Sequence, residues 1–141
     1  MTNFGTLRTY SCALALALTL AGCGTTFAMT PDASVPFAKG EIDASFVKGG
    51  NGKFVVRVEH LGPPAKLNPS ATVYIVWLKP KNDKGDQKAT NTGALKVDDN
   101  FAGELEFMTP FASFDVAITP ETAADVTEPA GRDILKTTVG G

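Results

Sequence analysis

Hydrophobic and polar residues alternate along much of the chain beyond residue 37. Two such segments flank a turn rich in glycine and asparagine: Ile42, Ala44 and Phe46 before it, and Phe54, Val56 and Val58 after it. An apolar residue at every second position is typical of a strand with one buried face, and Gly and Asn accept the positive φ of a tight turn. The sequence therefore predicts a β-hairpin in this region.

Further strand patterns follow at intervals of roughly ten residues, as in two-sheet sandwiches. They are Val73–Leu78, which is apolar on both faces, then Ala94–Asp98 and Glu104–Met108 as a second hairpin, then residues 114–118, and last residues 134–139. No segment has a convincing helical period. The expected fold is all-β, an immunoglobulin-like β-sandwich of about seven strands. Tyr74 and Trp77 should face opposite sides of their strand, with Trp77 in the core.

The N-terminal residues follow a different pattern, typical of an export signal. Arg8 is the only charge in residues 1–10, and an apolar run covers residues 13–20. This run is shorter than the roughly 20 residues that span a bilayer and fits the core of a signal peptide. The small residues Ala21 and Gly22 follow, as a signal peptidase requires. Residues 1–22 are therefore predicted to be a signal peptide.

The tetrad Leu20-Ala21-Gly22-Cys23 resembles the lipobox of bacterial lipoproteins. The resemblance implies cleavage between Gly22 and Cys23, a lipid such as palmitate on the Cys23 thiol, and a membrane partner held through that anchor. Gly24, where an aspartate would retain a lipoprotein at the inner membrane, implies the outer membrane facing the periplasm if the host is Gram-negative. The alternative is an ordinary secretory signal in which Cys23 is incidental.

The mature chain is then predicted to consist of a tether and one domain. Residues 23–36 are rich in Thr, Ser and Pro and are expected to form the lipidated tether, and residues 37–141 the β-sandwich. The second cysteine, Cys12, lies in the signal peptide, so Cys23 is the only mature thiol and no intrachain disulfide can form.

The charge balance excludes some classes of partner. The chain has 13 Lys and Arg against 15 Asp and Glu, so it lacks the strongly basic surface of a nucleic-acid-binding domain. We expect no nucleic-acid partner. The single basic cluster is expected to be a solvated loop: Lys79, Lys81, Lys84 and Lys88.

Few residues could carry chemistry. His60 is the only histidine; it is expected to continue the buried face of Phe54 at a strand end and to be structural. A zinc site needs three or four such ligands, and catalysis needs a positioned nucleophile. Asp98-Asp99-Asn100 and Asn82–Asp86 could bind calcium but are also ordinary turn sequences. Glu104 and Glu106 share a solvated face. No catalytic, cofactor-binding or metal residues are therefore predicted.

The second half of the chain is similar to the extracytoplasmic β-domain of anti-sigma-K-type factors. The similarity covers roughly residues 54–139 and rests on three segments: Tyr74-Ile75-Val76-Trp77-Leu78, Gly93-Ala94-Leu95, and Val116-Ala117-Ile118-Thr119 leading into residues 128–135. It implies a β-sandwich sensory or interaction domain. The sigma-binding segment and transmembrane helix of that family have no counterpart here.

Taken together, these features predict a lipid-anchored, non-enzymatic envelope protein that binds a protein or another envelope component. Exposed loop aromatics, Phe101 and Phe111, are the first candidates for partner contacts. The alternatives are a small periplasmic enzyme or metal-binding protein that uses His60 and nearby carboxylates, and a purely structural envelope part.

Overall fold

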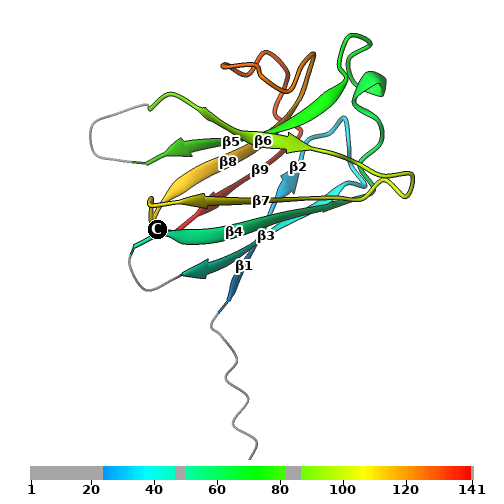
Figure 1. Ribbon diagram of the computed structural model, residues 1–141. Helices are drawn as coiled ribbons and strands as arrows, with labels where there is room; N and C mark the ends of the chain where they lie inside the picture. Colours follow the sequence, from blue (N-terminus) through cyan, green and yellow to red (C-terminus); the bar gives the residue numbers. More distant parts are fainter. Residues whose placement is uncertain (1–23, 47–49, 82–86, 141) are drawn as a thin grey trace, which may run out of the picture.

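Two antiparallel sheets stacked face to face make up the protein (Figure 1). The computed structural model describes residues 24–46, 50–81 and 87–140. The four-stranded sheet has the order β1-β3-β4-β7 and the five-stranded sheet the order β2-β9-β8-β5-β6. The strands are β1 (Thr25–Ala28), β2 (Thr30–Pro31), β3 (Lys39–Phe46), β4 (Gly52–Glu59), β5 (Val73–Pro80), β6 (Thr90–Leu95), β7 (Gly103–Thr109), β8 (Phe114–Glu121) and β9 (Leu135–Val139). The predicted all-β sandwich is confirmed, with nine strands in the described residues rather than about seven.

Strands β3 to β9 account for the immunoglobulin-like arrangement. Strands β3, β4 and β7 correspond to the A, B and E positions of such a sandwich, and β9, β8, β5 and β6 to G, F, C and C′. The predicted first hairpin is present as β3 and β4, which pair from Lys39 opposite Glu59 to Phe46 opposite Gly52. Strand β5 lies inside its sheet between β8 and β6, as its two apolar faces predicted.

The two additional strands come from the segment that was expected to be a tether. Strand β1 pairs with β3, placing Phe27 opposite Ile42, whereas β2 pairs with β9 in the other sheet. Met29 lies buried between them and donates its backbone N–H to the Gly40 carbonyl at 2.8 Å. The sandwich therefore begins at Thr25, not at residue 37, because this short segment crosses from one sheet to the other and closes one side of the core.

The expected second hairpin is absent from the described residues. Strand β6 pairs with β5 in the five-stranded sheet, whereas β7 pairs with β4 in the four-stranded sheet. Only one bridge, between Val97 and Gly103, joins the two arms of the turn. The predicted alternation is present along both arms, but the segment between them carries the chain from one sheet to the other.

The inward faces of the two sheets form a single hydrophobic core. Alternate residues of β4 and β8 lie fully buried in it, as their period predicted: Phe54, Val56 and Val58, and Phe114, Val116 and Ile118. At one end of the core, Phe54 stacks on Phe107 with ring centroids 5.5 Å apart and meets the edge of Phe114 at 5.0 Å. This packing joins the two sheets at that end of the core.

Candidate functional site

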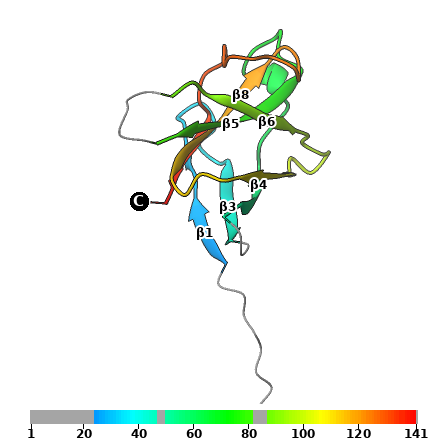
Figure 2. The ribbon, with the colours of Figure 1, turned by 60° about the vertical axis from the view of Figure 1, so that its left-hand side comes forward.

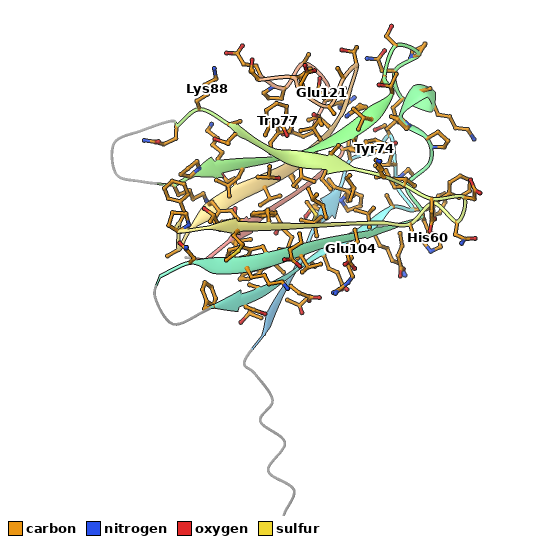
Figure 3. The ribbon with its side chains drawn as sticks, viewed as in Figure 1. His60, Tyr74, Trp77, Lys88, Glu104 and Glu121 are labelled. Carbon is orange, nitrogen blue, oxygen red and sulfur yellow. The ribbon has the colours of Figure 1, made fainter. Side chains whose placement is uncertain are left out.

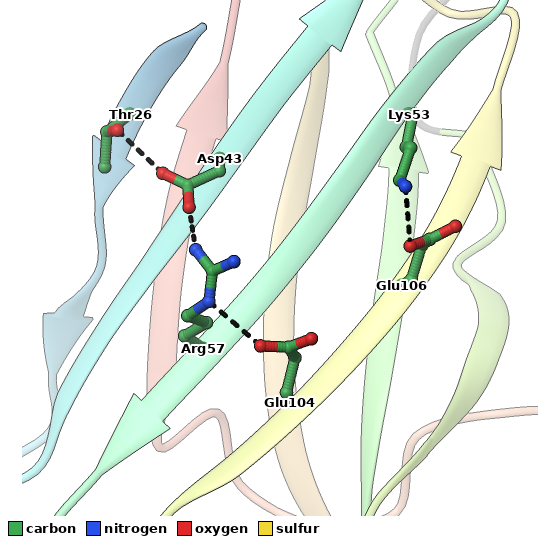
Figure 4. Close-up of polar contacts among 6 residues, drawn as sticks. All are labelled: Thr26, Asp43, Lys53, Arg57, Glu104 and Glu106. Carbon is green, nitrogen blue, oxygen red and sulfur yellow. Dashed lines mark hydrogen bonds and ion pairs between the residues drawn. The ribbon is translucent and has the colours of Figure 1, made fainter.

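The outer face of the four-stranded sheet is covered by paired charges (Figure 4). Arg57 on β4 contacts Asp43 on β3 and donates from Nε to Glu104 on β7 at 2.9 Å. Lys53 and Glu106 form a second ion pair at 2.9 Å. Glu104 and Glu106 thus lie on a solvated face, as predicted. Since each is neutralised by a cross-strand partner, this surface has the character of ordinary sheet exterior.

The outer face of the five-stranded sheet carries a groove of about 860 Å³. Its floor consists of outward-facing residues of β5, β8 and β9, and the long connection between β8 and β9 forms one wall. Figures 1 and 2 show this connection, in orange, on the side of the sheet that faces away from the other sheet. The lining residues that matter for the chemistry are Thr30, Trp77, Lys79, Lys88, Asp115, Ala117, Glu128, Pro129, Asp133, Lys136, Thr137 and Thr138. We name these residues the sheet groove.

Trp77 lies under this groove and not between the sheets. Tyr74 faces the inter-sheet core, so the two side chains do point to opposite sides of β5 as expected. Trp77 is buried, as predicted for a core residue, but it does not belong to the hydrophobic cluster between the two sheets. Its indole is buried because the β8–β9 connection folds over the outer face of the sheet (Figure 3), and a buried strand pattern does not show which layer covers each face.

A chain of hydrogen bonds fixes that connection to the sheet. Trp77 Nε1 donates to Thr119 Oγ1 at 2.8 Å, and the Thr119 hydroxyl donates to Glu121 Oε1 at 2.5 Å. The backbone N–H groups of Ala130 and Gly131 donate to the same Glu121 oxygen, each at 3.0 Å. Glu121 is only 2% exposed, so its carboxyl group is a buried acceptor that holds the wall of the groove in place.

A second set of contacts holds the same wall from β6. The Asn91 side-chain amide donates to the carbonyl oxygens of Ala124 and Val126, both at 2.9 Å. Near the rim, Lys88 and Glu128 form an ion pair at 3.0 Å. The wall is therefore attached to β8 and to β6, which makes the groove a formed feature of the protein before any ligand arrives.

The basic cluster of the sequence is divided by the fold. Lys79 and Lys88 line the sheet groove, whereas Lys81 pairs with Asp115 at 3.2 Å. Lys84 lies outside the described residues. Lys136 from β9 adds an exposed ammonium group to the groove, and sequence reasoning missed it because an isolated lysine in a strand has no distinguishing pattern.

His60 does not continue the buried face of β4. The strand ends at Glu59, His60 adopts a positive φ of 57°, and Leu61 takes the buried position instead. His60 lies exposed over a hollow of about 220 Å³ at the end of the sandwich that also contains Tyr74 (Figure 3). No carboxylate is among the described residues that line this hollow. A general base or metal site built on His60 thus finds no acidic partner there.

Tyr74 gives this end of the sandwich a measurable signature. Its hydroxyl donates to the Gly62 carbonyl at 2.5 Å, and burial raises the pKa of the phenol from 10.0 to about 12. Tyr74 ionises first in the unfolded chain, so its contribution to stability is constant below about pH 10 and is lost as the pH rises towards 12. We expect phenolate absorbance of the folded mature protein to rise with a midpoint near 12.

The sequence has two tyrosines, and removal of the predicted signal peptide, which contains Tyr10, would leave Tyr74 alone. The Tyr74→Phe variant should lack the late titration and lose stability less steeply above pH 10. A midpoint near 10 in the parent protein would show that the phenol is solvated and would contradict the packing described.

The remaining candidate sites resolve as structural features or fall outside the description. Asp98 Oδ1 accepts the N–H groups of Asn100 and Ala102 at 2.8 and 3.0 Å, which is the geometry of a turn. In the described part of the chain, no three His, Cys, Asp or Glu side chains come together to hold a metal ion. Asn82–Asp86, Gly22 and Cys23 lie outside it. No helix within it is long and apolar enough to cross a membrane.

Comparison with known proteins does not assign the chain to a family. No protein-family model matches the chain, and a search of curated proteins finds no significant match. The sheet groove and the N-terminal motif are therefore the basis for assigning a function.

Proposed function

We propose that this protein is a non-enzymatic, lipid-anchored module of a bacterial cell envelope, and that its sheet groove binds an extended segment of another envelope protein. The observation that carries the proposal is the groove of about 860 Å³ on the five-stranded sheet, with a wall held by Glu121 and Asn91. Its volume lies within the range of roughly 300–1,000 Å³ that is common for ligand sites.

The sequence around Cys23 supports the anchoring. A short apolar run, small residues and a cysteine follow one another in the order of a lipobox, and β1 begins two residues after Cys23. Acyl chains on Cys23 would attach the domain to a bilayer, since each buried CH₂ contributes about 0.8 kcal/mol.

The chemistry of the groove supports a polypeptide ligand. Ala117 and Pro129 supply apolar surface above the buried Trp77, while Lys136 and Asp133 place both signs of charge at the rim. A polypeptide segment offers matching apolar side chains, charges of both signs and backbone hydrogen-bonding groups.

The proposal is tested by photo-crosslinking in the cell. A photoreactive amino acid at position 136 of the full chain is expected to capture a discrete protein adduct, because Lys136 lies in the groove. The matched control places the same amino acid at position 41 on β3, where Glu41 is exposed in the four-stranded sheet. We expect no discrete adduct from that position.

Equal adducts from both positions, or none from position 136, would contradict a binding role for the groove and favour a structural part. An adduct that carries a non-protein envelope polymer would keep the groove as the site and change the class of ligand.

A further inference from the structure

We propose that the end of the sandwich at which the chain enters β1 inserts apolar side chains into the surface of a bilayer. This bilayer is the one to which the lipid on Cys23 would attach the protein. Phe46, Met108 and Phe111 make up this end surface, which we name the apolar end. They are 61, 60 and 45% exposed, although all three are large hydrophobic residues. The inference rests on the proposed lipidation of Cys23 and adds a second, direct contact between protein and lipid.

Strand register brings the three residues to the same end. Phe46 is the last residue of β3 and pairs with Gly52, which in turn pairs with Thr109 at the end of β7. Met108 precedes Thr109, and the Phe111 N–H donates to the Thr109 hydroxyl at 3.3 Å. The exposed residues thus lie on neighbouring strand ends, and not on unrelated parts of the surface.

The chain enters the fold beside this surface. Thr25 lies opposite Ala44, and β1 runs antiparallel to β3, so the backbone before Thr25 leads towards the end of β3 that carries Phe46. Cys23 is two residues before Thr25, and two residues of extended chain span at most about 7 Å. The headgroup layer of each leaflet is about 5–8 Å thick. An anchor on Cys23 would therefore keep Phe46, at the end of β3, within reach of the headgroups, and the end of β7 with Met108 lies two strands further along the same sheet.

The surroundings of the apolar end suit a lipid surface. The ring of Phe46 packs edge-on against buried Phe54, with centroids 6.0 Å apart, so it projects from a rigid base. Two carboxylates near this end, Glu106 and Asp115, are paired with Lys53 and Lys81, and so present less repulsion to anionic headgroups. The short anchor also leaves too little space for a protein partner between this end and the bilayer.

The opposite end provides a matched control. Phe101 lies in the turn before β7 and is 43% exposed, close to the value for Phe111. The only native tryptophan, Trp77, is buried in the sheet. Phe111→Trp and Phe101→Trp therefore each add one exposed fluorophore at a known end. The full-length protein, purified from membranes, is reconstituted into vesicles of phosphatidylethanolamine and phosphatidylglycerol with brominated acyl chains.

Flotation of the protein with the vesicles shows that it is attached to lipid. Quenching by the brominated acyl chains shows which end of the sandwich contacts the bilayer. Among floated protein, we expect loss of fluorescence from the tryptophan at position 111 and none from that at position 101. Floated protein with no quenching at either position, or with quenching at position 101 alone, overturns the inference while leaving the anchor intact. Failure to float shows that the proposed lipidation is wrong, and the inference falls with it.

Discussion

Replacing Phe54 with alanine is expected to lower the free energy of unfolding by about 4 kcal/mol. Phe54 is 0% exposed, and its ring contacts Phe107, Phe114 and Phe46 at centroid distances of 5.5, 5.0 and 6.0 Å. The neighbours belong to β7, β8 and β3, so the cavity would open between the two sheets where backbone relaxation is restricted. Chemical denaturation followed by tryptophan fluorescence measures the loss.

Phe46→Ala is the matched control for this prediction. It removes the same ring from the same aromatic group, but Phe46 is 61% exposed, so most of its surface is already in water. We expect a loss of about 1 kcal/mol, since hydrophobic stabilisation is proportional to the apolar area removed from water. Equal losses for the two variants would show that the core does not extend to this end as described.

Replacing Glu121 with alanine is expected to destabilise the protein by about 3 kcal/mol. The substitution leaves the buried Thr119 hydroxyl and the partly buried N–H groups of Ala130 and Gly131 without their acceptor. Gly131 packs tightly there, since a Cβ added to it would lie 2.2 Å from the Pro120 carbonyl oxygen. Loss of Glu121 should therefore also release the wall of the groove, which limited proteolysis of the folded protein would detect within residues 122–133.

Two variants separate this role from a general effect of charge. Glu121→Gln keeps a side chain of the same length with one acceptor oxygen, and should lose less stability than Glu121→Ala. Glu128→Ala removes an exposed carboxylate from the same connection, where the ion pair with Lys88 is solvated, and should change stability by less than about 0.5 kcal/mol. Comparable losses for Glu121→Ala and Glu128→Ala would contradict the buried network.

The sequence allowed prediction of those strands in which burial of every second residue determines the local pattern. The alternation along β3 and β4 and the glycine-rich turn act together, so the hairpin could be recognised locally. The doubly apolar segment Val73–Leu78 identified the internal strand β5 in the same way. In each case burial against the core selects the residue at every second position, and a reader of the sequence needs no knowledge of the partner strands.

Other parts depend on contacts between distant segments and were missed. Strands β1 and β2 are too short to show a period, and Met29 is buried only because β3 and β9 lie on either side of it. The segment between β6 and β7 has the spacing of a hairpin, yet strand pairing with β5 and β4 takes its arms into different sheets. Local alternation identifies a strand but does not specify its neighbour.

The groove shows the same limit for function. Trp77 was predicted to be a core residue, but its position under the β8–β9 connection depends on Glu121 and Asn91, which have no motif of their own. Thr119 and Gly131 both take part in holding this connection. These residues therefore have a structural role in shaping the groove. His60, the most visible chemical residue of the sequence, lies outside it.

The central claim, a domain attached to the envelope through Cys23, is tested most directly by the intact mass of the protein extracted from the membranes of a bacterial host. We predict a mature chain that begins at Cys23 and carries the added mass of a diacylglyceryl group, and no such species from the Cys23→Ala variant. A mature chain with an unmodified Cys23, or one cleaved at another residue and recovered without detergent, would contradict the account.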